Sequence, residues 1–339
     1  MFYFEKIKKI NLNPRAVYLL FIALILTAVA SVLSSSYSMD SMQYKNYFSL
    51  IAFGDYVNVE ASFYIVSFIS YLLFNSVIPV FVFYALVSVF VKIFIINKYS
   101  PYPFLSIIVF CSYYFLVQEG NMIRIGIASS FFMLACFSYF NKNYLSYFSL
   151  SLIAVFLHYS CFVVLFLPLI VSRSVRLGFY RSLFFLISCI LLAIFSSALN
   201  FIHDILVLLS TYDPTGKLVH YINLAENGVF TNINLANRIL PYLCFLIPLF
   251  FVYFKACNLN RYYSYYMQIV CFGLFVFSAL SPLPVLAYRF SEVFLIFCIL
   301  LFPFVTLLFE KKIFGFLYIF AYFLFSSLYI VVYLGYYDF

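Results

Sequence analysis

The sequence predicts an all-α polytopic membrane protein with about 10–12 transmembrane helices. Of its 339 residues, 67% are hydrophobic and 9% are charged, and the mean hydropathy is +1.09. A soluble domain of this length needs a far more polar surface. The apolar residues also form long continuous runs instead of helical stripes, which favours helices that face lipid or one another. The short segments of alternating polarity that are typical of a membrane β-barrel are missing from the sequence.

Ten apolar runs follow one another, and a helix needs roughly 20 residues to cross the bilayer. The first run is longer than a signal-peptide core, so we expect a retained span although Ala28-Val29-Ala30 resembles a cleavage site. The second run is interrupted at Asn75–Pro79 and is expected to make one net crossing. The fifth is expected to be a hairpin of two short helices with its apex near His158. The runs are 16–35, 61–97, 103–118, 122–140, 144–171, 182–201, 238–254, 264–281, 286–309 and 313–335.

Lys and Arg residues concentrate in the cytoplasmic loops of membrane proteins, and this rule orients the chain. The basic clusters that we assign to the cytoplasmic side are 6–15, Lys92/Lys98, Lys142, Arg173/Arg176/Arg181, Lys255/Arg261 and Lys311/Lys312. Two longer polar stretches, 37–60 and 202–237, then become outer loops of a single integral membrane domain, 1–339. Most acidic residues and all three His residues also fall on the outer side. Any chemistry is therefore expected there, in a cavity covered by surface helices.

Three Arg residues are expected at outward-facing N-termini of inward-running helices. Arg124 follows Asn121, a plausible N-cap, while Arg238 and Arg289 open later apolar runs. A cation at a helix N-terminus opposes the helix dipole, so three such placements favour a bound anion above them. Helix N-termini and guanidinium groups both bind phosphate, which makes these residues candidate diphosphate ligands. The alternative is that each Arg simply extends to the membrane interface.

Candidate acid–base residues are His158, Asp40 and Glu60. His158 lies deep in the run SLIAVFLHYSCFVVLF, where a buried imidazole needs a partner and is a functional candidate. Its alternative role is a hydrogen bond to a neighbouring helix carbonyl. Asp40 begins the pattern Asp40, Gln43, Tyr44, Tyr47 on one face of an interfacial helix, and Glu60 precedes the next apolar run. Either carboxylate is able to take a proton from a sugar hydroxyl, although a solvated loop carboxylate is the commoner role.

Further outer-side residues are candidate substrate contacts: Glu119, Tyr44 and His220. The eight Cys residues are scattered in apolar runs without paired spacing, and the three His residues lie far apart in sequence, so we predict no metal site. A D-x-D pair, a P-loop, GxGxxG and HExxH are all missing from the sequence, so neither a nucleotide-sugar site nor any cofactor or nucleic acid is expected.

The stretch IRIGIASSFFMLACFSYFNKNYLSYFSLSLIAVFLHYS, residues 123–160, resembles the core signature of the EpsG-like family, which is grouped with the Wzy-type O-antigen and exopolysaccharide polymerases. The matching positions are Arg124, Ile127 and Ala128, followed by His158 and Ser160. The family often has Gln after the Arg, where this chain has Ile125. Outside these residues the resemblance extends only to architecture.

The resemblance implies a bacterial inner-membrane glycosyltransferase with a GT-C-like fold. Its substrates would be undecaprenyl-diphosphate-linked oligosaccharides, delivered by a flippase, and a chain-length regulator is a further expected partner. The growing chain would pass from its lipid diphosphate to a hydroxyl group of the next lipid-linked unit. Three alternatives stay open: a flippase or transporter of the same lipids, an O-acyltransferase, and a membrane protein without enzymatic activity.

Overall fold

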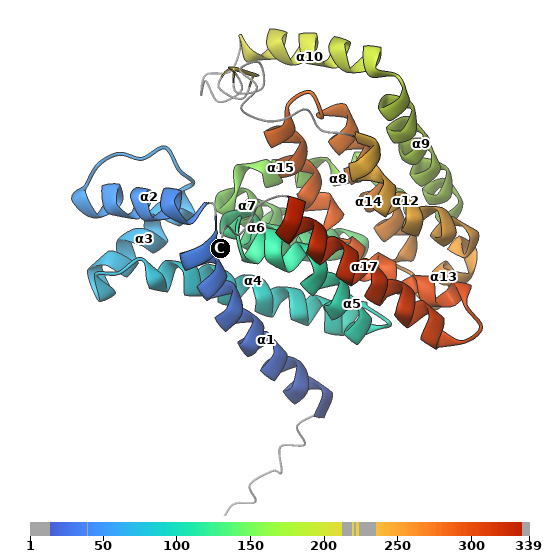
Figure 1. Ribbon diagram of the computed structural model, residues 1–339, viewed down its shortest axis with the longest axis horizontal. Helices are drawn as coiled ribbons and strands as arrows, with labels where there is room; N and C mark the ends of the chain where they lie inside the picture. The colour runs from blue at the N-terminus through green and yellow to red at the C-terminus, as the bar shows by residue number, and fades with distance from the viewer. Residues whose placement is uncertain (1–13, 39, 212–218, 220–221, 224–234, 334–339) are drawn as a thin grey trace, which may run out of the picture.

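In the computed structural model, the described residues are 14–38, 40–211, 219, 222–223 and 235–333, and every regular element among them is a helix (Figure 1). This confirms the predicted all-α fold class. The helices are α1 (Pro14–Val32), η1 (Leu33–Tyr37), α2 (Ser41–Phe53), α3 (Ala61–Phe74), α4 (Ile78–Tyr99), α5 (Pro103–Val109), η2 (Phe110–Glu119), α6 (Ile123–Phe140), α7 (Tyr144–Leu157), η3 (Tyr159–Phe166), α8 (Leu167–Ile170), α9 (Val175–Ile194), α10 (Ser196–Ser210), α12 (Leu235–Phe251), α13 (Tyr253–Leu259), α14 (Tyr263–Ala279), α15 (Pro284–Leu295), α16 (Cys298–Leu301), η4 (Phe302–Leu308) and α17 (Lys312–Tyr333).

Several of these helices are suited to a bilayer. Five are long and apolar enough to cross it: Val17–Tyr37, Ile78–Tyr99, Ile123–Phe140, Val175–Ile194 and Pro284–Leu308. A sixth candidate is the pair α12 and α13, which is bent by 77°. Shorter apolar helices of 10–17 residues lie beside them. The chain is therefore a multi-pass membrane protein, while the number of crossings and the orientation stay predictions.

Two breaks in the apolar runs lie where the sequence places them. At Asn75 the backbone adopts the left-handed conformation, with φ of 48°, and separates α3 from α4. Asn tolerates this conformation because its short polar side chain can bond locally. At His158 the backbone is extended, and it separates α7 from η3. The hydroxyl of Tyr147 donates to the carbonyl of Val164 across this break, at 2.6 Å. The helices α7 and η3 therefore form the hairpin that the sequence predicts within 144–171.

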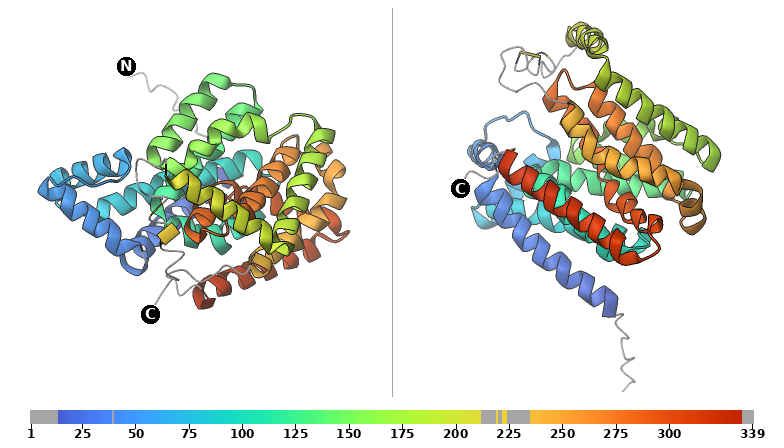
Figure 2. Two further views of the ribbon diagram at one scale, coloured as in Figure 1. Left: turned by 90° about the horizontal axis from the view of Figure 1, so that it is seen from above. Right: turned by 45° about the vertical axis from the view of Figure 1, so that its right-hand side comes forward.

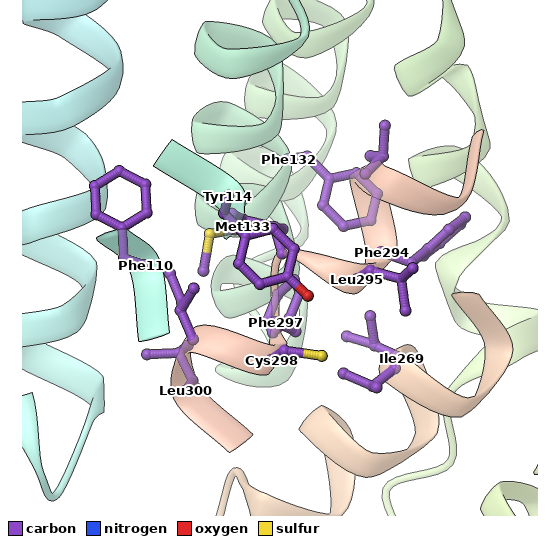
Figure 3. Close-up of a cluster of buried hydrophobic side chains, with 14 of the residues drawn as sticks. Phe110, Tyr114, Phe132, Met133, Ile269, Phe294, Leu295, Phe297, Cys298 and Leu300 are labelled. Carbon is purple, nitrogen blue, oxygen red and sulfur yellow. The ribbon is translucent and has the colours of Figure 1, made fainter. Parts of the chain in front are cut away.

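The centre of the bundle is a buried aromatic core in which η2, α6, α14, α15 and α16 meet (Figure 3). Phe132 of α6 packs edge-on against Phe294 of α15, with ring centroids 5.4 Å apart. Tyr114, Met133 and Cys298 fill the same region and are fully buried. Edge-to-face aromatic packing adds about 0.5–1.5 kcal/mol per pair to the area that it buries. This core packs α6, which carries Arg124, against α15, which carries Arg289.

Peripheral helices frame the core. The α2–α3 hairpin lies at one side of the bundle, and α10 lies across one end (Figures 1 and 2). The predicted run 182–201 divides at Phe195, where α9 ends and α10 begins in a different direction. Residues 202–210 of the predicted outer loop thus belong to α10, as expected for a surface helix. The DPTG turn, 213–216, lies outside the described residues.

Candidate functional site

Glu60 bridges two of the predicted site residues. It sits just before α3, where its backbone carbonyl accepts hydrogen bonds from the first turn of that helix. One carboxylate oxygen, Oε2, accepts a hydrogen bond from Nη1 of Arg124. The other, Oε1, lies 2.6 Å from Nδ1 of His158. Residues 60, 124 and 158, from three separate elements, therefore meet at one buried carboxylate.

The imidazole of His158 is held in one orientation. The side chain is 8% exposed, and the extended backbone between α7 and η3 directs it toward Glu60. The contact of Nδ1 with Glu60 favours the tautomer that carries hydrogen on Nδ1. Both ring nitrogens are buried, and apart from the contact of Nδ1 with Glu60 neither has a hydrogen-bond partner in the described part of the chain. Nε2 is therefore not needed to hold the imidazole in place, and it keeps a lone pair that can accept a proton.

Aromatic rings also surround Arg124. Its guanidinium carbon lies 5.2 Å from the ring centroid of Tyr44, 6.0 Å from that of Tyr47 and 5.8 Å from that of Phe63. These rings come from the α2–α3 hairpin, so the predicted face of α2 is directed at Arg124. Each cation–π contact contributes about 0.5–1 kcal/mol, and more where water is excluded.

Asp40 and Arg289 extend the cluster. Arg289 lies in α15 and is half-buried, and its positive charge acts on both Asp40 and His158. Asp40 immediately precedes α2 and is also half-buried. Its backbone amide donates to Oγ of Ser38 at 3.1 Å and to Oδ1 of Asn121 at 3.3 Å. We define the Glu60 cluster as Asp40, Glu60, Arg124, His158 and Arg289.

The two carboxyl groups of the Glu60 cluster respond differently to their surroundings. Burial on its own would raise the pKa of Glu60, but the hydrogen bond from His158 and the charge of Arg124 outweigh it and lower that pKa. Burial raises the pKa of Asp40, and the charges of Arg289 and Arg124 offset this only in part. Burial and the nearby Asp40 carboxylate also raise the pKa of Tyr44. Glu60 is thus a fixed anion, whereas Asp40 takes up a proton more readily.

Glu119 lies apart from the Glu60 cluster, and the structure does not describe the side chains of two other predicted site residues. Glu119 was expected to face substrate on the outer side, but its side chain is 1% exposed and paired with Lys92. The assignment of Lys92 to the cytoplasmic surface is wrong for the same reason, since Lys92 is fully buried. Arg238 lies in the first turn of α12, but its side chain is outside the described part of the structure. His220 is also outside it.

Asn121 has a different role from the one predicted. It is not the N-cap of α6, because that helix begins at Ile123 and Met122 occupies the cap position. Instead its Oδ1 accepts a hydrogen bond from Oγ of Ser38 at 2.6 Å, as well as the one from Asp40. Asn121 thereby ties the start of α2 to the turn that precedes Arg124. This contact was missed because it joins residues about 80 positions apart, which no local pattern reveals.

At the C-terminal end of α6, two Arg residues from other segments have neutral partners. Arg173 lies over the rings of Tyr139 and Tyr144, and its Nη2 donates to the Tyr144 hydroxyl at 2.7 Å. Arg261 donates to Oδ1 of Asn141 at 2.8 Å. These residues come from the basic clusters that the sequence assigns to the cytoplasm. Tyr hydroxyls and an Asn side chain surround the Arg residues here, whereas carboxylates and a His surround those at the other end.

Within the residues that the structure describes, no three His, Cys, Asp or Glu side chains gather in a way that could hold a metal ion. A pocket of about 260 Å³ is lined by Ser188, Leu191, Leu192, Phe195 and Phe275, none of which belongs to the Glu60 cluster. The predicted cavity above the cluster stays a prediction.

Comparison with known proteins identifies the family. A model of the EpsG family matches residues 16–338, nearly the whole chain. This chain belongs to the EpsG family. The expected resemblance is therefore confirmed, and the match extends far beyond the 123–160 signature on which it was based. Membership indicates a polysaccharide polymerase-like, glycosyltransferase-like protein. No curated protein and no solved structure matches this EpsG family chain significantly, so its likeness to the GT-C fold stays a prediction.

Proposed function

We propose that this EpsG family protein joins undecaprenyl-diphosphate-linked oligosaccharide repeat units at the outer face of the bacterial cytoplasmic membrane. The observation that carries the proposal is the convergence of Arg124 and Arg289 with His158 and two carboxylates at one end of α6. The Lys- and Arg-rich loops gather at the other end, which faces the cytoplasm if the orientation rule holds. A site on the outer side has no access to nucleotide sugars, so its donor carries a lipid-linked leaving group.

The reaction is a glycosyl transfer. A hydroxyl oxygen of the acceptor unit bonds to C1 of the donor chain while the bond between C1 and the lipid diphosphate breaks. The acceptor proton moves to Nε2 of His158, and the electron pair of the broken bond leaves on the diphosphate. Arg124 and Arg289 stabilise the negative charge that develops there, which is the kind of term that contributes most to such reactions. No metal ion is required in this scheme because two guanidinium groups neutralise the leaving group.

Glu60 and Asp40 have supporting roles in this scheme. Glu60 fixes the tautomer and orientation of His158, in the same way that a carboxylate orients the base in other hydrogen-bonded triads. It also neutralises Arg124 in the free protein, so the guanidinium is not left as an uncompensated buried charge. Asp40 is the second candidate base, and the positive charge of Arg289 acts on it. Tyr47 is half-buried and offers an aromatic ring beside the site for a sugar to stack on, whereas Tyr44 is 2% exposed and supports Arg124 from within the bundle.

The alternative function is a flippase or transporter of the same lipid-linked sugars. Such a protein carries polar groups through the depth of the membrane. One observation favours it: Lys92, Gln118 and Glu119 form a polar network inside the bundle. Their side chains are 0–1% exposed, however, and so they line no open path. The polymerase accounts better for the Glu60 cluster.

Purified protein in lipid nanodiscs tests the proposal. It is supplied with lipid-linked repeat units and no nucleotide, and products are separated on a gel. We expect a ladder of polymer from the wild type and a rate about 10²–10³-fold lower from Arg124→Ala. Arg124→Lys is expected to recover little, because Lys lacks the planar fork of Arg.

Arg173→Ala is the matched control, because Arg173 also lies over two Tyr rings but is remote from the Glu60 cluster. It should give a wild-type ladder. Transfer of intact lipid-linked units across a vesicle bilayer without any polymer would support the flippase instead. A wild-type rate from both Arg124 variants would remove Arg124 from the mechanism.

A further inference from the structure

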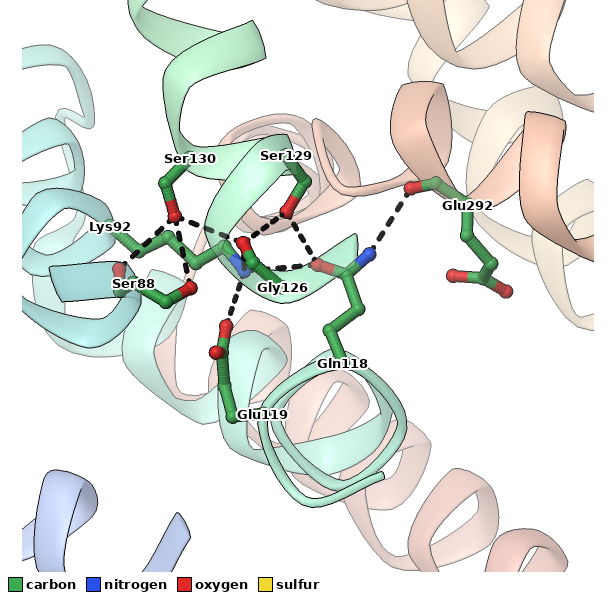
Figure 4. A network of polar contacts seen from close by, with 8 residues as sticks. All are labelled: Ser88, Lys92, Gln118, Glu119, Gly126, Ser129, Ser130 and Glu292. Carbon is green, nitrogen blue, oxygen red and sulfur yellow. Dashed lines mark hydrogen bonds and ion pairs between the residues drawn. The ribbon is translucent and has the colours of Figure 1, made fainter. Parts of the chain in front are cut away.

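Lys92 is the centre of a buried polar network that the proposed reaction does not use (Figure 4). Its ammonium group donates to Oε1 of Gln118 at 2.9 Å, to the carbonyl of Gly126 at 3.1 Å and to the carboxylate of Glu119. An ammonium has three hydrogens, and here each has an acceptor. Lys92 therefore has no hydrogen left to donate to a ligand. The network's role is better explained by the helices that it joins.

The network joins the helices that carry the two Arg residues. Gly126 is in the first turn of α6, two residues after Arg124. Its carbonyl accepts from Lys92 and also from Oγ of Ser129 and Ser130, at 2.8 and 3.1 Å. Gln118 accepts from Lys92 with its carbonyl oxygen and donates with Nε2 to the carbonyl of Glu292, at 3.2 Å. Glu292 lies one turn after Arg289 on α15.

The close packing at Gly126 strengthens the connection. A Cβ atom at this position would lie 2.7 Å from Oε2 of Glu119 and 2.9 Å from the carbonyl oxygen of Gln118. Only a residue without a side chain lets the end of η2 approach the first turn of α6 so closely. The backbone amide of Met122 also donates to the carbonyl of Val117, at 2.9 Å. The turn that carries Arg124 is therefore fixed on two sides.

A buried Lys–Glu pair is an inefficient way to stabilise a fold. Removing both charges from water is costly, and apolar residues of similar volume often stabilise as well or better. Polar networks whose members are all satisfied do specify one arrangement of the elements that they join. This network joins α4, η2, α6 and α15, and two of these elements carry the guanidinium groups of the Glu60 cluster.

We propose that Lys92 is a positioning residue, which fixes Arg124 relative to Arg289 so that both guanidinium groups meet one diphosphate. This inference rests on the proposed function, since it assigns the diphosphate to these two Arg residues. It goes beyond that function in predicting that a residue which never touches substrate controls how tightly the diphosphate is bound. Errors of about 1 Å in such positioning reduce rates by roughly 10²-fold.

The test is a double-mutant cycle read out by binding. Lys92→Met with Glu119→Gln removes both charges together, so no buried charge is left without a partner. The dissociation constant of undecaprenyl diphosphate is measured on this variant, on Arg124→Ala, and on the combination of all three substitutions. We expect the Lys92/Glu119 variant to bind about tenfold more weakly than the wild type, an effect within the usual range for coupled residues. Added to Arg124→Ala, the same two substitutions should weaken binding by less than about twofold.

Gln268→Met is the control for a general loss of packing. Gln268 is a buried hub of α14 whose amide accepts from the Ser172 amide at 2.6 Å and donates to the Ser172 carbonyl at 3.0 Å. Its loss should lower the unfolding temperature without changing the affinity for undecaprenyl diphosphate. Gly126→Ala, which displaces Glu119 by a different route, should weaken binding as the Lys92/Glu119 variant does.

Two results would overturn the inference. One is wild-type affinity in the folded Lys92/Glu119 variant. The other is an equal loss of affinity with and without Arg124, which would show that Lys92 does not act through that residue. If the Lys92/Glu119 variant fails to fold, the same comparison is made with Gly126→Ala. A wild type that binds undecaprenyl diphosphate but makes no polymer would refute the proposed function while leaving the positioning role intact.

Discussion

The two ends of α6 are built from similar parts and differ in one respect. At each end an Asn side chain joins distant segments: Asn121 accepts from Ser38 and Asp40, and Asn141 accepts from Arg261 and the Tyr262 hydroxyl. At each end an Arg lies over two Tyr rings. The difference is in the charged partners. Arg124 meets Glu60 and the His158 that Glu60 contacts, whereas Arg173 donates to a carbonyl and a hydroxyl.

This difference indicates that Arg173 anchors the protein at the membrane interface and that Arg124 takes part in the reaction. An Arg that rests on Tyr rings and donates to neutral oxygens holds a helix end at the membrane interface. An Arg that shares a buried carboxylate with a His costs considerable desolvation free energy, and it is better explained by a ligand than by stability. Polar atoms at the Arg124 end also lack partners, since Nε of Arg124 and Nε2 of His158 make no hydrogen bond among the described residues. The predictions below test whether chemistry belongs to this end alone.

The largest effect is expected from His158→Asn. Removing the proposed base should reduce the rate of polymer formation by about 10²–10⁴-fold, because general-base catalysis contributes that much. The unfolding temperature should change little, since the Asn amide can take the place of Nδ1 beside Glu60 and Nε2 makes no hydrogen bond that the fold would lose. The rate is measured with purified protein and lipid-linked repeat units, and folding is followed by thermal denaturation in detergent.

His203→Asn is the control for His158, because His203 lies on α10 with a side chain that is 30% exposed and 3.8 Å from Asp204. It should polymerise at the wild-type rate. Asp40→Asn, tested in parallel, should reduce the rate by less than about tenfold if His158 is the base. The opposite order of the two effects would assign the base to Asp40 and break the proposed mechanism at that step.

Sequence patterns predicted the all-α fold class and named the residues that meet in the candidate site. Long apolar runs and their breaks at Asn75 and His158 determine the helices, since the bilayer leaves few alternatives to them. Glu60, Arg124 and His158 were found individually because each is an ionisable residue at the edge of, or within, an apolar run. Lys92 carried the same signal, but its nearness to Lys98 suggested a surface cluster, and its pairing with Glu119 depends on the packing of α4 against η2. Side-chain pairings across the bundle are tertiary, and no local pattern encodes them.

The next prediction compares Asn121→Ala with Asn141→Ala. Each substitution removes a side-chain oxygen that accepts two hydrogen bonds, and Asn141→Ala also removes the donor to the Phe137 carbonyl. Each should therefore lower the free energy of unfolding by about 1–3 kcal/mol. Only Asn121→Ala should also affect the reaction, by roughly 3–10-fold, because the start of α2 would no longer be tied to the turn before Arg124. Both quantities are measured on the same preparations. Equal rates in the two variants would show that the tie between Ser38, Asp40 and Asn121 serves stability alone.

The smallest effect concerns the pH dependence of stability. Burial raises the pKa of Asp40 above its ordinary value of 3.8, so the folded protein binds this proton more tightly than the unfolded chain does. Ionised Asp40 therefore destabilises the fold, and this contribution grows as the pH rises from the ordinary value through the raised pKa. Asp40→Asn, which resembles the protonated form, should flatten that decline and unfold at neutral pH at the wild-type temperature or a few degrees above it. Asp55→Asn, at an exposed carboxylate just after α2, should leave the profile unchanged. A lower unfolding temperature for Asp40→Asn at neutral pH would contradict this prediction. It would mean that the attraction of Arg289 and Arg124 for ionised Asp40 exceeds the effect of burial. The charges at this end of α6 would then stabilise the fold, and a bound ligand would not be needed to explain them.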